Sequence, residues 1–525
     1  MKPLKNRFSA IPLLLLAVAI GCSSAAGVVP TAEAATDALV SGSTQASADS
    51  EISYPIVDSS QVYCYEDGGS ITCPTEDEVF FGQDAQYSGN EPAYIDNGDG
   101  TVTDTVTGLI WQQDPGEKMT FEEAAAGAED FSLAGYDDWR LPSIKELYSL
   151  ILFSGYDPSG WNGTDTSELV PFISDVFNFE YGDTERGERI IDSQFASSNK
   201  YVSTTMGGDE TLFGVNFADG RIKGYGLSLR RQEKTFFVLY VRGNTDYGTN
   251  EFVDNGNGSI TDLATDLTWM QNDSESGMTW DDALAYCEYL EYADMDDWRL
   301  PNVKELQSIV DYSRSPDTTD SAAIDSIFKV TSITNEAGQE DFPYYWSSTT
   351  HASEKSGMNA SYVAFGRSMG YMGDTWMDVH GAGSQRSDPK AGDAADYPTG
   401  HGPQGDSIRI NNYVRCVTGG VEDSVITGGE TDASVGSGKI FIDGDGQINV
   451  EMQSVQGEQP GQGRTPPQEA IDACHNLTEG AICTVITPNG AIDGTCENLQ
   501  TQLVCVPEGG PPNGGGQQQP PNTHP

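Results

Sequence analysis

The sequence predicts an α+β fold that occurs twice in tandem. An Asp-Asn-Gly-x-Gly turn begins at Asp96 and again at Asp254, and a Trp-Arg-Leu-Pro segment begins at Trp139 and again at Trp298. The spacing between the copies is 158 residues at the first motif and 159 at the second. Repeats that stack as solenoids or propellers have periods of ~20 to 50 residues. We therefore expect each copy to be a self-sufficient globular domain, over residues 94–243 (copy 1) and 252–417 (copy 2).

Each copy begins with strands and continues with two helices. Alternating polar and apolar residues around the glycine-containing turn predict a hairpin in each copy. A polar residue followed three positions later by an acidic one marks the start of each helix. These pairs are Thr120 with Glu123, Thr279 with Asp282, Ser143 with Glu146, and Asn302 with Glu305.

The predicted inward faces are apolar at helical spacing. In the first helix they are Phe121, Ala124, Ala125 and Ala128 in copy 1, and Trp280, Ala283, Leu284 and Cys287 in copy 2. In the second helix they are Ile144, Leu147 and Ile151, and Val303, Leu306 and Val310.

Short closing strands end each copy after a long irregular stretch. By sequence we match residues 201–205 with 345–349, 213–217 with 362–365, and 237–242 with 410–415. Strands, then helices, then strands again predict an antiparallel sheet with the helices segregated from it.

The ends of the chain predict export and a lipid anchor. Lys2, Lys5 and Arg7 precede an apolar run at residues 11–20 that is too short for a permanent membrane helix, so residues 1–21 are interpreted as a signal peptide. Small residues before Cys22 resemble a bacterial lipobox, which makes Cys22 the predicted lipid attachment site. An ordinary signal peptide with an incidental cysteine is the alternative.

The position of Ser23 after the predicted lipidated cysteine favours the outer membrane, by analogy with lipoprotein sorting. Residues 22–53 are small and polar and are predicted to be a disordered tether. Residues 418–465 are a Gly-rich linker with a hairpin, and residues 508–525 are predicted to be a disordered tail.

The charge excludes one class of partner. Asp and Glu number 80 against 27 Lys and Arg, which gives a formal net charge of -53. Such a field repels polyanions, so we expect no nucleic-acid partner. The same charge favours cations and serves solubility, and the sequence does not separate these two roles.

Eight cysteines remain when Cys22 is set aside, an even number that suits an exported protein with disulfides. Cys64 and Cys73 flank an Asp-Gly-Gly-Ser turn in the segment 54–93 and are predicted to be paired.

Cys287 and Cys416 are predicted to be the second pair. Their counterparts in copy 1 are Ala128 and Gly243, so both are missing there together, as a bridge lost as a unit would be. Four more cysteines in a module at 466–507 have three possible connectivities; they are Cys474, Cys483, Cys496 and Cys505.

These motifs resemble a known family. The glycine turn, the Trp-Arg-Leu-Pro helix start, the Trp-Ser-Ser-Thr strand and the terminal Tyr-Val-Arg-Cys-Val are similar to those of the Lcl C-terminal domain family. The resemblance implies two tandem C-type lectin-like domains, each an antiparallel sheet with two helices, and we add a small disulfide-rich β tail. The family's namesake is a bacterial surface adhesin that binds sulfated glycosaminoglycans. Copy 1 departs from the pattern in lacking the disulfide and in its shorter final third.

No catalytic, cofactor or metal motif is present, so we predict a protein that is not an enzyme and has no cofactor. The five histidines show no zinc-binding spacing, and the chain has no Gly-x-Ser-x-Gly elbow. The turn at Asp96 lacks the spacing of a calcium loop and is interpreted as a hairpin turn. Arg140 and Arg299, and likewise Lys145 and Lys304, are interpreted as structural residues at the helix start.

The copies differ most between residues 372 and 408, where copy 2 carries insertions. Long loops on a rigid domain often hold binding residues. The candidate ligand-binding residues are Trp376, which could stack on a sugar, and the polar residues Asp374, His380, Arg386 and Asp406. A loop packed on its own domain is the alternative.

The leading hypothesis is a non-enzymatic, outer-membrane lipoprotein of the cell envelope, adhesin-like, that binds a glycan or a surface protein. Two alternatives stay open. One is an enzyme on a formylglycine-generating-like fold, which would need reactive cysteines, and the other is a structural spacer of the outer membrane.

Replacing Cys22 tests the lipid anchor. Cys22→Ala should abolish the shift into the detergent phase and the added mass on the mature N-terminus, because both require acylation of the thiol. Phase partitioning and intact-mass measurement check this. A Cys22→Ala protein that still fractionates with membranes would point to a different anchor.

Overall fold

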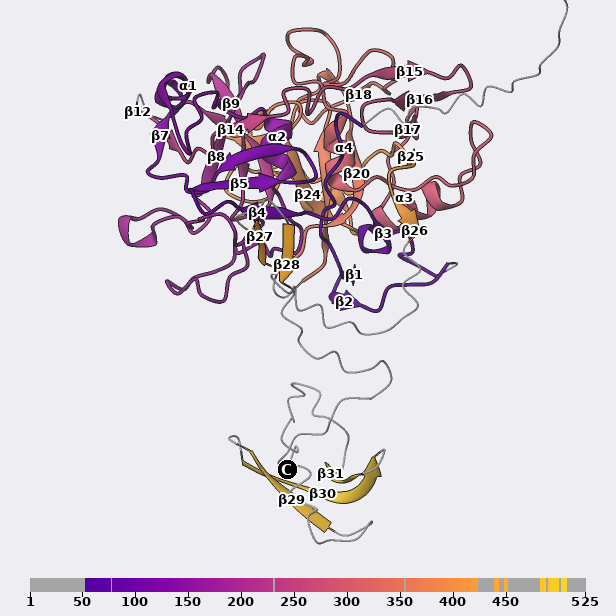
Figure 1. Cartoon of the computed structure of the whole chain (residues 1–525). Coiled ribbons are helices and arrows are strands. Elements are labelled where there is room, and N and C mark those ends of the chain that lie inside the picture. Colours follow the sequence, from indigo (N-terminus) through magenta and orange to yellow (C-terminus); the bar gives the residue numbers. More distant parts are fainter. Residues whose placement is uncertain are drawn as a thin grey trace, which may run out of the picture. The chain divides into compact units, whose positions relative to one another are not determined.

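The computed structural model describes residues 52–76, 78–229, 232–353 and 356–423, and five strands beyond them. The predicted signal peptide, Cys22, the tether up to residue 51 and the terminal tail lie outside the described residues. The chain divides into two compact units, residues 1–429 and 430–525. The first unit, shown in indigo to orange in Figure 1, is mostly β-sheet, with four α-helices among its described residues.

Each copy contains the same four-stranded antiparallel sheet, built from three strands at its start and one at its end. In copy 1 its order is β14 (Val241–Gly243), β6 (Leu109–Gln112), β5 (Thr101–Asp104) and β4 (Tyr94–Asp96). In copy 2 it is β15 (Phe252–Asp254), β16 (Ser259–Asp262), β17 (Leu267–Met270) and β25 (Val417–Thr418).

The Asp-Asn-Gly-x-Gly segments are hairpin turns, as predicted. Gly98 and Gly100 have φ angles of 72° and 88°, which favour glycine. The Asp96 carboxylate accepts a hydrogen bond from the Gly98 N–H at 2.8 Å, and Asp254 does the same for Gly256. These carboxylates therefore close their own turns.

The four helices start close to where the sequence predicts. They are α1 (Phe121–Asp130), α2 (Ile144–Ser149), α3 (Trp280–Glu288) and α4 (Val303–Ser308). Capping boxes form at α1, α2 and α4. The capping box predicted at Thr279 is wrong. The Thr279 hydroxyl donates to the Asp281 and Asp282 carboxylates and does not accept a hydrogen bond from the helix backbone. Asp282 is one methylene shorter than the glutamate at the other helix starts.

The predicted helix faces are buried at the second helix of each copy and at α3, but in α1 only Ala124 is buried, and Phe121 and Ala128 are half-buried. Ala125 is exposed, so α1 packs through Ala124 over a narrower stripe than its sequence suggests. In α3, Trp280 and Leu284 are buried as expected.

A second sheet joins the two copies. Its six strands run in the order β20 (Tyr344–Thr350), β21 (Asn359–Ala364), β24 (Gln385–Pro389), β10 (Arg221–Gly226), β9 (Thr211–Asn216) and β8 (Gln194–Lys200). The first three come from copy 2 and the last three from copy 1. The two halves meet where Ile222 of β10 pairs with Gln385 of β24.

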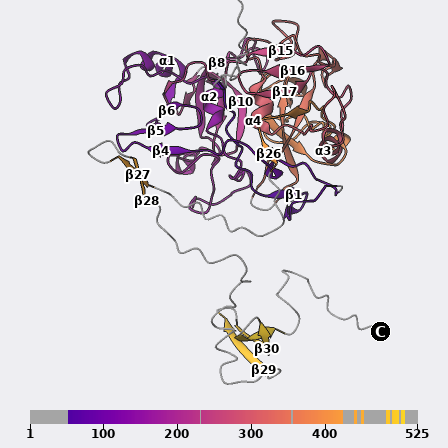
Figure 2. The ribbon, with the colours of Figure 1, turned by 45° about the vertical axis from the view of Figure 1, so that its right-hand side comes forward.

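The helices α2 and α4 also pack against each other across this junction. Figure 2 shows α2, β10 and α4 in the middle, with copy 1 in indigo and purple on one side and copy 2 in pink and orange on the other. One hydrophobic core crosses the boundary: the rings of Phe213 and Tyr312 lie 4.9 Å apart. The copies therefore form one compact unit and are not the separate globules that the repeat spacing suggests.

One predicted strand match is wrong. Residues 201–205 follow the strand β8 and are not part of it; the counterpart of β20 is β8 itself. Ser197 donates to the Phe213 carbonyl and Ser347 to the Ser361 carbonyl, which fixes the equivalence. The sequence of residues 201–205 resembles that of residues 345–349, and this resemblance displaced the match between the two copies by six residues. Residues 410–415 form isolated bridges and no extended strand.

The remaining elements of this unit are short. Two-stranded pairs are β1 (Cys64–Glu66) with β2 (Gly69–Ile71), β7 (Met119–Thr120) with β13 (Thr235–Phe236), β11 (Ser228–Leu229) with β12 (Gln232–Glu233), β18 (Ile333–Thr334) with β19 (Glu340–Asp341), β22 (Met369–Met372) with β23 (Thr375–Asp378), and β3 (Tyr87–Ser88) with β26 (Glu422–Asp423). The 3₁₀ turns are η1 (Asp84–Gln86), η2 (Thr184–Arg186) and η3 (Ala394–Asp396).

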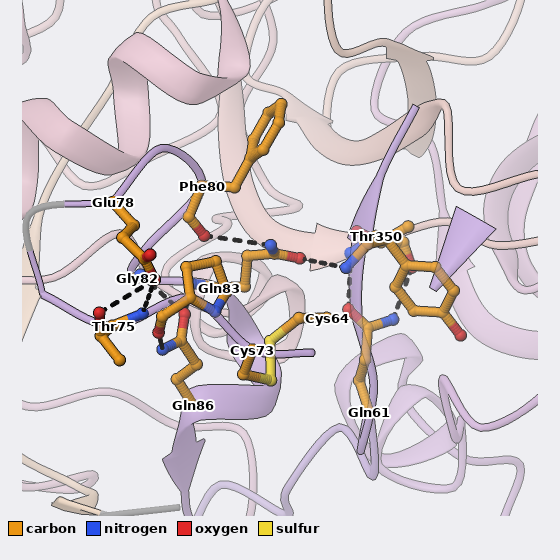
Figure 3. The surroundings of a disulfide bond; sticks show 12 residues. Gln61, Cys64, Cys73, Thr75, Glu78, Phe80, Gly82, Gln83, Gln86 and Thr350 are labelled. Atoms are coloured by element: carbon orange, nitrogen blue, oxygen red, sulfur yellow. Dashed lines mark hydrogen bonds between the residues drawn. A yellow bond between two sulfur atoms is a disulfide. The ribbon is translucent and has the colours of Figure 1, made fainter. Parts of the chain in front are cut away.

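The N-terminal segment packs on copy 2 around the Cys64–Cys73 disulfide (Figure 3). Gln61 exchanges two hydrogen bonds with the Thr350 backbone, at 2.7 and 2.8 Å. The buried Lys304 ammonium donates to the carbonyls of Asp58 and Ser149. Lys304 thus joins the N-terminal segment to both copies, which agrees with its predicted structural role.

The arginine at each helix start is also structural. Arg140 forms a two-pronged ion pair with Glu146, at 2.7 and 2.5 Å. Arg299 does the same with Glu305, at 2.7 and 2.6 Å. Each glutamate is the third residue of its helix and takes part in the capping box there. Each ion pair therefore fixes the start of a helix.

The C-terminal unit contains β-hairpins. The strands β27 (Lys439–Ile442) and β28 (Ile448–Glu451) pair antiparallel within the segment predicted to be a linker with a hairpin. A three-stranded sheet follows, with β29 (Ile482–Thr487), β30 (Gly490–Leu499) and β31 (Gln502–Pro507). Cys496 is disulfide-bonded and lies opposite Cys505 in register. The full connectivity of this module stays a prediction.

The Cys287–Cys416 disulfide is present and links α3 to the end of copy 2. Its sequence separation is 129 residues, against 9 for Cys64–Cys73. In the chain-entropy model the longer loop stabilises by ~4 to 5 kcal/mol and the shorter one by ~2 to 3 kcal/mol. Replacing Cys287 and Cys416 together by Ala should therefore lower the melting temperature more than the same change at Cys64 and Cys73. Equal losses in the two double variants, or a different partner for Cys287 in non-reducing peptide mapping, would contradict this.

A buried acid at the junction makes stability depend on pH. Asp378 accepts hydrogen bonds from the Tyr201 hydroxyl of copy 1, at 3.1 Å, and from the Gly381 N–H. Burial raises the pKa of Asp378 to about 7. A carboxyl group with a raised folded-state pKa stabilises when protonated, and this contribution is lost as pH rises from about 4 through 7.

Asp378→Asn should therefore raise the free energy of unfolding by ~1 to 3 kcal/mol at pH 8, because a neutral amide removes the buried charge. At pH 5 the variant and the wild type should be nearly equal. Urea denaturation at the two pH values checks this, and parallel curves for the two proteins would contradict it.

Candidate functional site

A large pocket lies at the junction of the two copies. It has a volume of about 1410 Å³ and is lined by residues of both halves. The pairing of β10 with β24 is limited to Ile222 and Gln385. Since side chains alternate along a strand, Ile222 faces the core while Arg221, Lys223 and Tyr225 share the opposite face, and these three line the pocket.

Three ion pairs form the centre of the pocket. Arg221 pairs with Asp157 at 2.8 Å, Lys223 pairs with Asp219, and Arg386 pairs with Asp406. Asp157, Asp219, Arg221 and Lys223 come from copy 1, whereas Arg386 and Asp406 come from copy 2.

Burial sets the charge states here. Burial lowers the pKa of His380 to about 4, with the Arg386 charge acting in the same direction, so this imidazole is neutral near pH 7. Burial likewise lowers the pKa of Lys223 to about 8, which Asp219 opposes. Burial raises the pKa of Asp406, but the Arg386 charge and the hydrogen bond from His380 outweigh it and hold this pKa well below its ordinary value.

Several buried polar atoms of the lining residues have no hydrogen-bond partner among the described residues. They include Nε and Nη1 of Arg386, Nδ1 of His380 and Oδ1 of Asp219. His380 and Asp219 are only 1 % and 0 % exposed. An unpaired buried polar group costs ~1 to 3 kcal/mol, so these residues of the pocket lining keep hydrogen-bonding capacity that the described protein groups do not use.

The structure brings together three of the five predicted binding residues. His380 Nε2 lies 3.1 Å from Asp406 Oδ1, and Arg386 contacts the other oxygen of the same carboxylate. Trp376 and Asp374 lie outside the lining of the pocket. Trp376 packs edge-on against Tyr371, 5.4 Å away, within the β22–β23 hairpin, and Asp374 is exposed in its turn.

Sequence reasoning missed the half of the site that copy 1 supplies. Arg221, Lys223 and Tyr225 alternate along one strand, which is a visible signal of a polar strand face. Copy 2 was selected as the binding half because its loop before β24 is long. Copy 1 has no such loop, because a tight turn connects β9 directly to β10. Nothing local in the sequence indicates that the two strands meet.

Neither a metal site nor a membrane helix is visible in the described part of the chain. No three His, Cys, Asp or Glu side chains there gather closely enough to hold a metal ion. No helix among those residues is long and apolar enough to cross a membrane.

Comparison with known proteins agrees with the repeat. The family model of the Lcl C-terminal domain matches residues 100–242 and again residues 258–380. The second match ends at His380, so Arg386 and Asp406 lie beyond it. No curated protein matches the chain, and no solved structure does either. Because the two matches cover more than half of the 525 residues, the chain belongs to the Lcl C-terminal domain family and contains its domain twice.

Proposed function

We propose that this protein is a non-enzymatic cell-envelope lipoprotein whose two domains, C-type lectin-like in fold, bind a glycan or another surface ligand. The observation that carries the proposal is the pocket between the copies, with its buried and unpartnered polar atoms. Ligand sites are concave and hold a few polar groups that fix orientation. Attachment to the outer membrane through Cys22 would present this pocket at the cell envelope.

The duplication produces one shared binding site and not two independent ones. Two independent sites would strengthen binding by engaging the ligand together. Here Lys223 of copy 1 and Arg386 of copy 2 line the same pocket. The duplication therefore builds one site from two halves, and its affinity depends on the junction.

The enzymatic alternative has little support. Formylglycine-generating chemistry would need a reactive thiol, and the thiolate is the reactive form of cysteine. All four cysteines within the described residues 52–423 are in disulfides, Cys64 with Cys73 and Cys287 with Cys416. A purely structural spacer would have no use for a polar pocket that leaves buried donors and acceptors unpaired.

A glycan array probed with the full-length protein, with and without a calcium chelator, tests the proposal. We expect retention of a defined glycan class, and the chelator arm decides whether calcium takes part. Absence of binding to every glycan on the array would contradict a glycan ligand.

Heparin should not bind tightly, although the family's namesake binds sulfated polymers. The net charge of -53 repels a polyanion, and the cations at the centre of the pocket are each paired with a carboxylate. We expect a dissociation constant above ~1 μM at ~0.15 M salt, where charges more than ~8 Å apart are largely screened. Titration calorimetry with heparin oligosaccharides checks this, and sub-micromolar binding would contradict it.

A further inference from the structure

We infer that the pocket between the copies takes an uncharged, polyhydroxylated ligand, a neutral saccharide unit, held between Arg386 of copy 2 and Asp219 of copy 1. This inference rests on the proposed function and narrows its ligand to one chemical class.

The unpartnered atoms include both donors and acceptors. Nε and Nη1 of Arg386 can only donate, and Oδ1 of Asp219, as a carboxylate oxygen, can only accept. His380 has an unpartnered Nδ1, and its neutral ring donates through one nitrogen and accepts through the other. A hydroxyl group both donates and accepts, so a row of hydroxyls satisfies such a mixed set. A carboxylate or sulfate accepts only and would leave Asp219 unpaired.

The charges of the pocket lead to the same conclusion. The three central cations, Arg221, Lys223 and Arg386, are matched by Asp157, Asp219 and Asp406, so the centre has no excess positive charge. Over the whole described lining, six cations face seven carboxylates. The cations are Lys118, Arg189, Arg221, Lys223, Lys234 and Arg386, and the carboxylates are Asp157, Glu188, Asp192, Asp209, Asp219, Glu233 and Asp406.

This balance is unusual for the molecule, which has 27 basic residues against 80 acidic ones. The pocket is thus nearly neutral within a strongly acidic protein. An anionic ligand would lose the favourable field that a basic pocket provides and would still be repelled by the surrounding charge.

The aromatic residues and the size suit a sugar ring. Tyr225 and Tyr397 line the pocket together with the charged residues, and aromatic side chains offer apolar faces beside polar tips. A volume of about 1410 Å³ exceeds the ~300 to 1,000 Å³ typical of small-molecule sites, which leaves room for more than one sugar unit.

Matched sugar pairs test the inference on the full-length protein. The probes are glucose and galactose with their linear trimers, each compared with glucuronic or galacturonic acid, in which a carboxylate replaces one hydroxymethyl group. Titration calorimetry and ligand-observed NMR should show that a neutral member binds at least several-fold more tightly than its acid. Its affinity should change little when the salt concentration is raised tenfold, because no net charge is neutralised.

Variants of Arg386 separate hydrogen bonding from charge. Arg386→Lys keeps a cation beside Asp406 but loses the unpartnered Nε and Nη1 donors, so we expect at least tenfold weaker binding of the neutral sugar. Asp219→Asn should weaken binding several-fold from the copy 1 side. Arg367→Gln is the control, because Arg367 pairs with Asp317 at 2.6 Å outside the pocket lining, and it should bind like the wild type. Melting temperatures verify that each variant is folded.

The outcomes are distinguishable. Tighter, salt-sensitive binding of the acidic sugars, or wild-type affinity in folded Arg386→Lys, would overturn the neutral-sugar inference and leave a glycan-binding function intact. No binding of any probe here, together with a blank glycan array, would overturn both proposals.

Discussion

The edge-to-edge pairing of β10 with β24 is the constraint on which the rest of the structure depends. Each copy folds a three-stranded half-sheet whose outer strand would expose unpaired backbone groups, and such edges are prone to uncontrolled association. The two edges pair with each other at Ile222 and Gln385, so each edge meets the other copy and not a second molecule at that point. Contacts beside this pair hold the copies in register, among them Tyr201 with Asp378 and the packing of α2 on α4.

The same pairing concentrates charge at the junction. The strand face opposite the core bears Arg221 and Lys223, and Arg386 lies next to them on the neighbouring strand. Like charges across neighbouring strands repel, so each cation needs its own carboxylate. Asp157, Asp219 and Asp406 supply them. Arg386 and Asp219, both in the pocket lining, keep hydrogen-bonding atoms that no described protein group pairs.

Sequence reasoning succeeded where the determinants are local or duplicated. The Ser143–Glu146 box, the structural role of Arg140 and the Cys287–Cys416 bridge could each be predicted from short spacings or from a comparison of the two copies. It failed where one segment of chain must choose a distant partner. The register of β8 and the β10–β24 junction depend on long-range pairing, which the local alternation of side chains does not specify.

The difference between the copies explains why the site is asymmetric. Gly220 and Gly383 occupy corresponding positions before β10 and β24, with φ angles of 65° and 106°, which makes Lys223 and Arg386 the equivalent cations of the two halves. Lys223 finds its carboxylate four residues back, at Asp219.

Arg386 instead pairs with Asp406, twenty residues further along the chain, in the segment by which copy 2 is longer. That inserted region also supplies His380, whose imidazole touches the same carboxylate. A symmetric junction would have presented two like cations to each other. The insertion in copy 2 neutralised one of them with the Asp406 carboxylate, and in doing so it turned a junction between repeats into a polar pocket with room for a ligand.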